Sequence, residues 1–307
     1  MRSPCIKVPK SKAEETKKIL AKKGLLQELR WKREGDYVII PVKGMVEGFE
    51  PCEDDFEKRK KRRKIGSFDI VGDVAIVKHR DGNLQEIIEE IKNMKNIRKI
   101  AIDYGVKGEE RIRDLRLVEG DDLITIHREY GIRLKTDLSK VYFSPRLAME
   151  RWRVVQMVRN GETIFDMFAG CGPFSVMIAK YRDVKIYATD INPYAIAYLK
   201  ENIKINRVKG IEPILGDARE VAKKIKADRI IMNLPHSSFN FLPDAFKASK
   251  SGTIVHYYEI LPKENSREDE IMELAEEEGV KLKIKEKRRV HAYSPSKDMF
   301  AFIIKII

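Results

Sequence analysis

The sequence has few cysteines and no long apolar run. Its three cysteines, Cys5, Cys52 and Cys171, form no Cys-x-x-Cys pair and have no histidine at the spacing of a metal site. The sequence therefore predicts neither a disulfide framework nor a zinc site, and no other bound metal. No apolar stretch approaches the roughly 20 residues of a membrane helix, and residues 1–5 lack the apolar core of a secretion signal. We therefore expect a soluble, cytoplasmic protein with no membrane partner.

Acidic residues are outnumbered by basic ones. The 307 residues include 61 lysines and arginines against 48 aspartates and glutamates, which leaves a net charge of +13. An uninterrupted run of cations spans Lys58–Lys64. Such an excess favours a polyanionic partner because each neutralised phosphate releases counterions. Nucleic acid is the first partner to consider, and the basic run is either an arm for phosphates or a solvated tether.

The chain length and its patterns predict several domains. Strand-like segments at Ile6–Val8 and Tyr37–Val42 flank a helical stripe, which Ser11 and Glu14 precede at the spacing of a capping box. Further along, two strand pieces surround the Gly72-Asp73 turn. They are followed by a helix over 84–94, a strand over 97–102 and a hairpin over 123–137. We divide the chain into a small α/β domain (1–55), a basic linker (56–66), an α+β middle domain (67–143) and a catalytic domain (144–307).

Strands and helices alternate in the last part of the chain, which predicts a doubly wound α/β sheet. Two final β-like runs, Val280–Arg289 and Met299–Ile307, break that alternation and predict an antiparallel pair at the sheet edge. A parallel sheet that ends in this way is typical of class I, Rossmann-like S-adenosylmethionine-dependent methyltransferases. The other strands are expected at 163–167, 184–189, 211–215, 228–233 and 252–258.

Four of these strands end in polar or turn residues, where a doubly wound sheet places its ligand. After the first comes a glycine-rich turn with Gly170 and Gly172, which lets a ligand approach the backbone beside a helix N-terminus. The third glycine of a dinucleotide-binding motif is missing, since Ser175 stands there. Asp190 after the second strand is placed for ribose hydroxyls, and Asp217 after the third is placed for an adenine edge.

The turn after the fourth strand, Asn233-Leu-Pro-His236, faces the acceptor side. Enzymes that methylate exocyclic amines typically carry Asn/Asp-Pro-Pro-aromatic there, and the Leu and His of this turn depart from that pattern, which disfavours an adenine N6 or glutamine target. Methylation of cytosine C5 needs a cysteine nucleophile, and none lies in this segment. A ring nitrogen such as guanine N1 instead needs a carboxylate to remove its proton and a cation to stabilise charge on the adjacent oxygen. Arg146 and Glu150 precede the sheet and would share one helix face. They read either as site residues or as a surface ion pair.

Together these segments resemble the archaeal and eukaryotic tRNA (guanine-N1)-methyltransferases that modify position 37. The resemblance covers nearly the whole chain and rests on a set of short motifs. They are Arg111-Ile-Arg113, Thr125-Ile-His127, Lys140–Arg146, Glu150-Arg151, Asp166–Ser175, Asp190–Pro193, Asn233-Leu-Pro235 and His256-Tyr-Tyr258. It implies a monomer that uses S-adenosylmethionine and binds tRNA at the anticodon loop, with the N-terminal domain at the elbow.

The resemblance also implies roles for individual residues. Glu150 would be the general base for the N1 proton, and Arg111 would hold guanine O6. Tyr142 would position the donor and the target base, while Asn233 and Pro235 would line the flipped base. The methyl-donor pocket would be formed by Arg146, Phe168, Gly170, Gly172, Asp190, Ile191, Asn192, Asp217, Ala218 and Asn233.

Three other functions fit parts of the pattern. A related enzyme of wybutosine synthesis transfers an aminocarboxypropyl group from the same cofactor, but it lacks the Asn-Leu-Pro turn and the Glu of the Arg-Leu-x-x-Glu run. A bifunctional branch also methylates a tricyclic guanine derivative and differs in the turn after the fourth strand. From another class, the chain would be an RNA-binding module with a vestigial cofactor fold. The residues favour the guanine methyltransferase.

Overall fold

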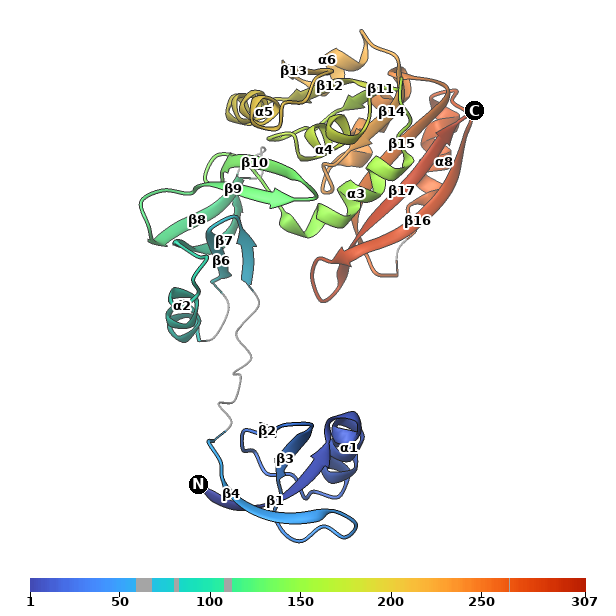
Figure 1. Ribbon diagram of the computed structural model, residues 1–307. Coiled ribbons are helices and arrows are strands. Elements are labelled where there is room, and N and C mark those ends of the chain that lie inside the picture. The colour runs from blue at the N-terminus through green and yellow to red at the C-terminus, as the bar shows by residue number, and fades with distance from the viewer. Residues whose placement is uncertain (59–67, 80–82, 108–111, 265) are drawn as a thin grey trace. The chain divides into compact units, whose positions relative to one another are not determined.

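The structure of the chain is a computed structural model that describes residues 1–58, 68–79, 83–107, 112–264 and 266–307 (Figure 1). The chain forms two compact units that divide between residues 65 and 66. Within the described part of the chain, no helix is long and apolar enough to cross a membrane. Of the basic run, Lys58 is described and residues 59–64 lie outside the described residues.

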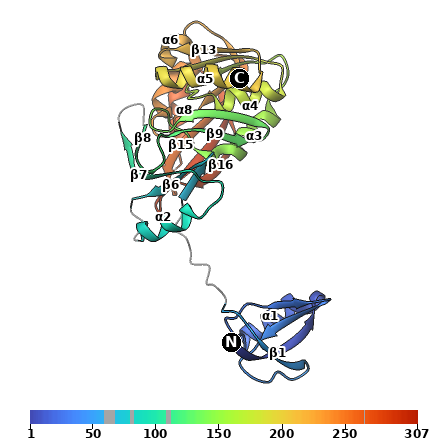
Figure 2. The ribbon, with the colours of Figure 1, turned by 60° about the vertical axis from the view of Figure 1, so that its left-hand side comes forward.

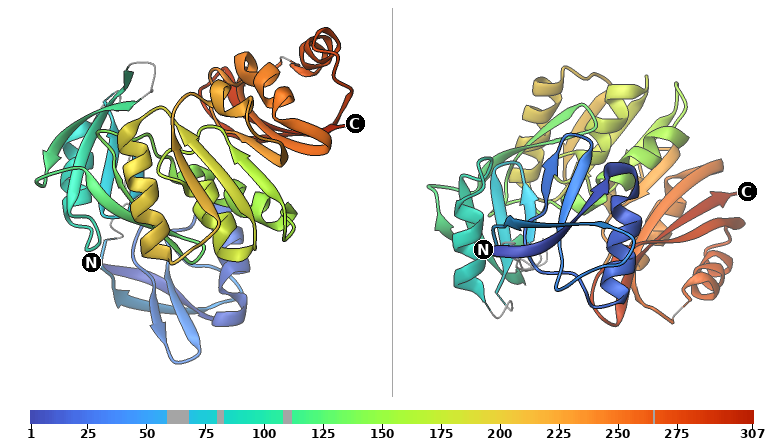
Figure 3. Two further views of the ribbon diagram at one scale, coloured as in Figure 1. Left: turned by 90° about the horizontal axis from the view of Figure 1, so that it is seen from above. Right: turned by 60° about the horizontal axis from the view of Figure 1, so that its bottom comes forward.

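The first unit is an antiparallel four-stranded sheet in the order β2, β3, β1, β4, with helix α1 against it (Figure 3). Ile6 and Val8 of β1 and Leu20 of α1 are buried and pack in one core. The two predicted strands and the helix are confirmed, whereas β2 and β4 were not predicted. The elements are β1 (Arg2–Pro9), α1 (Ala13–Lys22), β2 (Lys32–Glu34), β3 (Tyr37–Pro41) and β4 (Glu50–Asp55).

The predicted capping box is wrong. A 3-10 turn over Lys10–Lys12 precedes α1, so the helix begins at Ala13 with Lys12 as its N-cap, and no side-chain hydrogen bond caps it. The tighter turn moves Ser11 out of the N-cap position, where its hydroxyl would have accepted a hydrogen bond from the first helical turn. The spacing of Ser11 and Glu14 alone does not show this shift.

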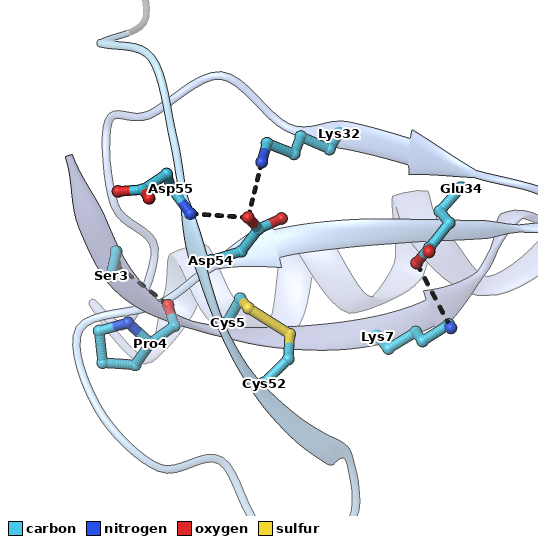
Figure 4. The surroundings of a disulfide bond; sticks show 9 residues. All are labelled: Ser3, Pro4, Cys5, Lys7, Lys32, Glu34, Cys52, Asp54 and Asp55. Carbon is cyan, nitrogen blue, oxygen red and sulfur yellow. Dashed lines mark hydrogen bonds and ion pairs between the residues drawn. A yellow bond between two sulfur atoms is a disulfide. The ribbon is translucent and has the colours of Figure 1, made fainter.

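A disulfide joins Cys5 to Cys52, which corrects the expectation of none (Figure 4). Strands β1 and β4 pair antiparallel with Cys5 directly opposite Cys52, and their Cα atoms lie 4.8 Å apart. This separation is within the range that a disulfide spans. The bond was missed because the two cysteines lie 47 positions apart in the sequence and the pairing depends on the register of a strand that was not predicted.

The second unit begins with a four-stranded sheet in the order β5, β6, β7, β8 and a separate two-stranded hairpin, β9–β10. The predicted Gly72-Asp73 turn, the helix and the hairpin are confirmed. Asn206 and Asn202 of helix α5 (Pro193–Asn206) accept hydrogen bonds from the backbone N–H groups of Arg133 and Lys135, at 2.8 and 2.7 Å. These bonds join β10 to helix α5. The elements are β5 (Phe68–Val71), β6 (Val74–Lys78), α2 (Leu84–Lys92), β7 (Lys99–Lys107), β8 (Ile112–Glu119), β9 (Ile124–Glu129) and β10 (Ile132–Asp137).

The sheet of the predicted catalytic domain (the catalytic sheet) has seven strands in the order β13, β12, β11, β14, β15, β17, β16. Strands β11 to β15 are parallel, and β17 and β16 are antiparallel, as predicted. The strands are β11 (Thr163–Asp166), β12 (Lys185–Asp190), β13 (Ile211–Leu215), β14 (Ala227–Met232), β15 (Ser249–Pro262), β16 (Leu282–Ala292) and β17 (Lys297–Ile306).

Helices cover both faces of this sheet (Figure 2). Successive side chains of a strand point to opposite faces, so Ile231 of β14 packs with α3, α4 and α5, whereas Ile230 and Met232 pack with α6, α7 and α8. Val71 and Leu134 from the preceding segments belong to the first of these cores. The three-domain boundaries therefore stay a prediction. The helices are α3 (Ala148–Met157), α4 (Pro173–Tyr181), α5 (Pro193–Asn206), α6 (Ala218–Ala222), α7 (Leu242–Lys247) and α8 (Glu268–Glu277).

Candidate active site

The glycine-rich turn is fixed by the aspartate that ends the neighbouring strand. Gly170 and Gly172 have φ values of 56° and 84°, in the left-handed region that favours glycine. The Gly170 N–H donates to Asp190 Oδ2 at 2.7 Å, and α4 begins one residue after Gly172. A Cβ built on Gly170 would lie 3.9 Å from the Tyr142 carbonyl oxygen, and among the described residues nothing outside its own chain neighbours would lie nearer. The turn is therefore open enough for a ligand to reach its backbone.

The Asp190-Ile191-Asn192 segment combines one structural side chain with one exposed apolar one. Asp190 Oδ1 accepts from the Asn192 N–H at 2.9 Å. The Asn192 side chain caps α5 by accepting from the Tyr194 N–H at 2.9 Å, and its Nδ2 donates to the Lys140 carbonyl at 2.7 Å. Asn192 is thus committed to holding the loop, whereas Ile191 is 53% exposed and offers an apolar surface beside it.

Asp217 follows strand β13, and Phe168 follows β11 just before the glycine-rich turn. Asp217 caps the short helix α6 and forms a two-point ion pair with Arg219, whose hydrogen bonds hold the pKa of Asp217 below its usual value. Ala218, which follows it, is buried. Phe168 packs edge-to-face against Phe241, with ring centroids 4.9 Å apart.

The interpretation of Arg146 and Glu150 as a surface ion pair required the two side chains to pair with each other. Instead, Arg146 pairs with Asp69. Arg146 lies in a 3-10 turn before α3 rather than in that helix, and its Nη2 lies 2.8 Å from Asp69 Oδ1 on strand β5. Arg113 also reaches Asp69, at 3.5 Å, and its guanidinium lies 5.6 Å from the ring centroid of Tyr142. Asp69 and Arg113 thus join the predicted residues Arg146 and Tyr142 in one cluster. Neither residue had a predicted role, because their positions depend on the sheet of the middle segment.

Arg111, predicted to hold guanine O6, lies outside the described residues. Its role stays a prediction from the resemblance. Arg113, on strand β8, is the described arginine nearest to Arg111 in the sequence, and it belongs to the cluster around Asp69.

The turn after β14 carries a buried polar atom that lacks a partner. The Pro235 carbonyl accepts from the Ile260 N–H of β15 at 2.8 Å, and the Leu234 carbonyl accepts from the Ser238 N–H and hydroxyl. The turn is therefore held firmly. None of the described residues donates a hydrogen bond to the buried Oδ1 of Asn233. A buried acceptor of this kind takes its hydrogen bond from a water molecule or a ligand.

Asp166 at the end of β11 shows a second unmatched acceptor. Its Oδ2 accepts from the Ser175 hydroxyl at 2.7 Å, but no described residue donates to its buried Oδ1. Burial raises the pKa of Asp166 to about 7, and the nearby Asp190 charge acts in the same direction. The cysteine of the same turn, Cys171, is buried, which raises its pKa to about 12 and leaves it an unreactive thiol.

Glu150, the predicted general base, lies in the first turn of α3 with its side chain 5% exposed. The hydroxyl of Tyr258, on β15, donates to Glu150 Oε1 at 3.0 Å. Arg288, on β16, forms an ion pair with Glu150 Oε2. Tyr258 belongs to a motif of the resemblance, but neither it nor Arg288 had a predicted role. Their contact with Glu150 depends on the pairing of β15, β17 and β16, which the sequence alone does not show.

Strand β15 brings the predicted residues together. Tyr258 contacts Glu150 through its hydroxyl, and its ring lies 5.8 Å from that of Phe174, in the first turn of α4 beyond the glycine loop. Two residues further, the Ile260 N–H holds the turn that contains Asn233 and Pro235. A carboxylate, an unmatched amide oxygen and an open glycine loop therefore surround one end of the parallel strands.

Comparisons with known proteins identify this arrangement. Residues 125–287 match the TRM5/TYW2 methyltransferase domain, and residues 5–50 match the tRNA methyltransferase 5 N-terminal domain. The tRNA (guanine(37)-N(1))-methyltransferase Trm5b of Pyrococcus abyssi is 42% identical over alignments covering 94% of this chain and 95% of that protein. Its crystal structure matches with a TM-score of 0.78 over 99% of both chains at 40% identity.

Two further matches are a structure that contains tRNA and a transferase with a different named activity. The structure of aTrm5 in complex with tRNALeu matches with a TM-score of 0.71 and 34% identity over 99% of each chain. The tRNA(Phe) (4-demethylwyosine(37)-C(7)) aminocarboxypropyltransferase of Methanocaldococcus jannaschii is 37% identical, covering 73% of this chain and 92% of that protein. These matches confirm the predicted fold class, and the family that the motifs resembled is likewise confirmed. From the match over residues 125–287 and the near full-length similarity to Trm5b, the chain belongs to the TRM5/TYW2 methyltransferase family.

Proposed function

We propose that this enzyme methylates N1 of guanine 37 in tRNA, with S-adenosylmethionine as methyl donor. The observation that carries the proposal is the buried carboxylate of Glu150 on α3, which accepts a hydrogen bond from Tyr258 of β15, the strand that also fixes the Asn233-Leu-Pro turn. Guanine N1 carries a proton at neutral pH, so its methylation needs a base at that atom. Near full-length similarity to enzymes named for this reaction supports the same assignment.

The residues present fit the methyl donor. The open Gly170 backbone, the exposed Ile191 side chain and the unmatched oxygens of Asp166 and Asn233 suit a ligand with a nucleoside part and hydrogen-bond donors. S-adenosylmethionine supplies an electrophilic methyl group on a sulfonium centre. The pocket residues are proposed to be Arg146, Phe168, Gly170, Gly172, Asp190, Ile191, Asn192, Asp217, Ala218 and Asn233.

Glu150 removes the N1 proton and leaves the nitrogen electron pair for the new bond. Negative charge then develops on O6, which Arg111 holds according to the family resemblance. Tyr142 and Asn233 position the base, and Pro235 shapes the turn that lines it. The target guanine lies within the anticodon loop, so it must leave its stack to reach these groups.

The N-terminal unit is proposed to bind the tRNA elbow. It contains a hollow of ≈ 550 Å³ whose lining includes Lys10, Lys17, Arg30, Arg33 and Trp31, together with one carboxylate, Glu14. Four cations beside an aromatic ring suit the phosphates and bases of RNA. The net charge of +13 acts in the same direction.

The experiment incubates the enzyme with methyl-labelled S-adenosylmethionine and tRNA transcripts that carry G37 or A37. We expect 1-methylguanosine at position 37 of the first transcript and no product on the second. Mass spectrometry of the nucleosides separates this product from an aminocarboxypropyl adduct, the activity named for the Methanocaldococcus jannaschii relative. Equal transfer to A37, or an aminocarboxypropyl product, would refute the proposal. A monomeric state stays a prediction, which light scattering on the purified enzyme tests.

A further inference from the structure

Arg288 and Tyr258 lie in one row across the closing strands of the sheet. Tyr258 of β15 pairs with Ala301 of β17, and Ala301 pairs in turn with Arg288 of β16. Residues directly opposite one another in a sheet point to the same face. The two side chains therefore flank a small residue on the face that α3 covers. Ala301 leaves space between them, and the carboxylate of Glu150 contacts both.

The two side chains contact different oxygens of that carboxylate. The Tyr258 hydroxyl donates to Oε1 at 3.0 Å, and the Arg288 guanidinium pairs with Oε2. Burial raises the pKa of Tyr258 well above its ordinary value, so the hydroxyl keeps its proton and remains a donor. Each carboxylate oxygen retains a further lone pair, so a carboxylate fixed at both oxygens can still accept the N1 proton.

Arg288 is itself held by a second acidic residue. Its Nε lies 3.4 Å from Glu286 Oε1, and Glu286 also pairs with Arg153, three residues after Glu150 on α3. Carboxylates and guanidiniums therefore alternate along a chain of ion pairs that starts at Glu150 on α3, passes through Arg288 and Glu286 on β16, and ends at Arg153 on α3. The Glu286 ion pair restricts the direction of the Arg288 side chain, while the buried Nε donates a hydrogen bond to none of the described residues.

We propose that Arg288 is a positioning residue that holds the carboxylate of Glu150 in the orientation needed to take the guanine N1 proton. The proposal rests on the proposed function of Glu150 as general base. Without Arg288, the buried carboxylate loses its charged partner and rotates toward another one. A displacement of about 1 Å at a reacting group lowers a rate by up to about a hundredfold.

The test compares Arg288→Gln with Arg289→Gln in single-turnover methyl transfer at saturating donor and tRNA. Arg289, the next residue on β16, pairs with Asp298 and has a side chain 56% exposed, so it is a matched control. We expect Arg288→Gln to lower the rate about 10- to 100-fold and Arg289→Gln to leave it within about twofold. Binding of S-adenosylmethionine and of tRNA should stay within about twofold in both variants. Arg288→Lys should recover part of the rate, because an ammonium group reaches one oxygen as a point charge.

A double-mutant cycle tests the contact without any activity. If Arg288 holds Glu150, the stability lost in the double variant Glu150→Gln/Arg288→Gln is smaller than the sum of the two single losses. Additive losses, or a transfer rate for Arg288→Gln equal to that of Arg289→Gln, would overturn the inference. A rate loss matched by an equal loss of donor binding would also overturn it. A wild-type enzyme that makes no 1-methylguanosine would instead refute the proposed function. The double-mutant cycle would still measure whether Arg288 and Glu150 interact.

Discussion

The carboxylate of Asp69 pairs with Arg146, 77 residues further along the chain. Both Nε and Nη2 of Arg146 approach Asp69 Oδ1, at 2.9 and 2.8 Å, and Arg113 approaches Oδ2 at 3.5 Å. Asp69 has a side chain that is 13% exposed and lies on a strand outside the catalytic sheet. A single partly buried carboxylate therefore fixes two guanidiniums, one of which belongs to the predicted methyl-donor pocket.

Asp69→Asn should weaken binding of S-adenosylmethionine. An amide lacks the charge that holds Arg146, so the guanidinium leaves its place in the pocket. We expect the Kd for the donor to rise about tenfold, measured by calorimetry without tRNA. Asp121→Asn, at an exposed position of the same unit, serves as control and should leave the Kd unchanged. An unchanged Kd in Asp69→Asn would place Arg146 outside the pocket.

Glu150→Gln should slow methyl transfer without weakening donor binding. The amide keeps the size of the side chain but has no lone pair basic enough to take the N1 proton. We expect the single-turnover rate to fall about 100-fold or more, while the Kd for S-adenosylmethionine stays within about twofold. Equal losses in rate and donor binding would show that Glu150 has a structural role instead.

Gly172→Ala should destabilise the second unit by about 1–3 kcal/mol. Its φ is 84°, and an added Cβ would collide with the buried Leu199 side chain. Gly161→Ala has the same φ of 84° with open space around it, and Gly216→Ala has neither a positive φ nor a neighbour within 4 Å. The three variants should therefore rank in that order of lost stability. Urea unfolding in a Trp31→Phe background follows Trp152, which reports on the second unit alone.

Asp166→Asn should change how stability depends on pH. The pKa of this carboxyl is about 7 in the folded protein against an ordinary value of 3.8, so the folded state binds the proton more tightly. The group's contribution is therefore favourable at pH 4 and is lost as the pH rises toward 7. We expect the variant, measured without cofactor, to gain stability relative to wild type between pH 4 and pH 8. A constant difference across this range would contradict the shifted pKa.

Reduction of the Cys5–Cys52 disulfide should destabilise the N-terminal unit. The 47-residue separation corresponds to about 4 kcal/mol of loop-closure free energy in the unfolded chain. In a Trp152→Phe background, Trp31 fluorescence should show unfolding at lower urea after reduction or in Cys5→Ser/Cys52→Ser. Thiol titration of denatured protein gives a direct count. One free thiol, from Cys171, is expected before reduction and three after it. Three thiols in both samples would contradict the disulfide.

The catalytic sheet followed from the sequence because its signals are local. Apolar runs such as Ile164-Phe165 and Ile230-Ile231 alternate with helical stripes, and each strand end is marked by turn residues. The carboxyl ends of parallel strands meet at one edge, so the approximate location of Asp190, Asp217 and Asn233 could be predicted together. The first unit was harder, since the short strands β2 and β4 carry mostly polar residues.

The contacts of the site could not be predicted in the same way. Arg146 and Glu150 are four residues apart, which suggested a shared helix face, but the 3-10 turn at Arg146 separates their directions. Their partners Asp69 and Arg288 lie 77 residues before one and 138 residues after the other. Strand register sets these contacts, and spacing along the chain carries no information about register.

The sequence alone determined the sheet of the methyltransferase, its glycine-rich turn and the identity of the family. These follow from local periodicity and from motifs whose residues are close in the chain. Only the tertiary structure decided which groups hold the proposed base and the cofactor arginine, and that Cys5 faces Cys52. The reason is physical. Side chains from distant parts of the chain meet across strands, and the register of those strands is fixed by the burial of whole sheet faces. Tyr258 and Arg288 therefore reach Glu150 only when β15, β17 and β16 have paired.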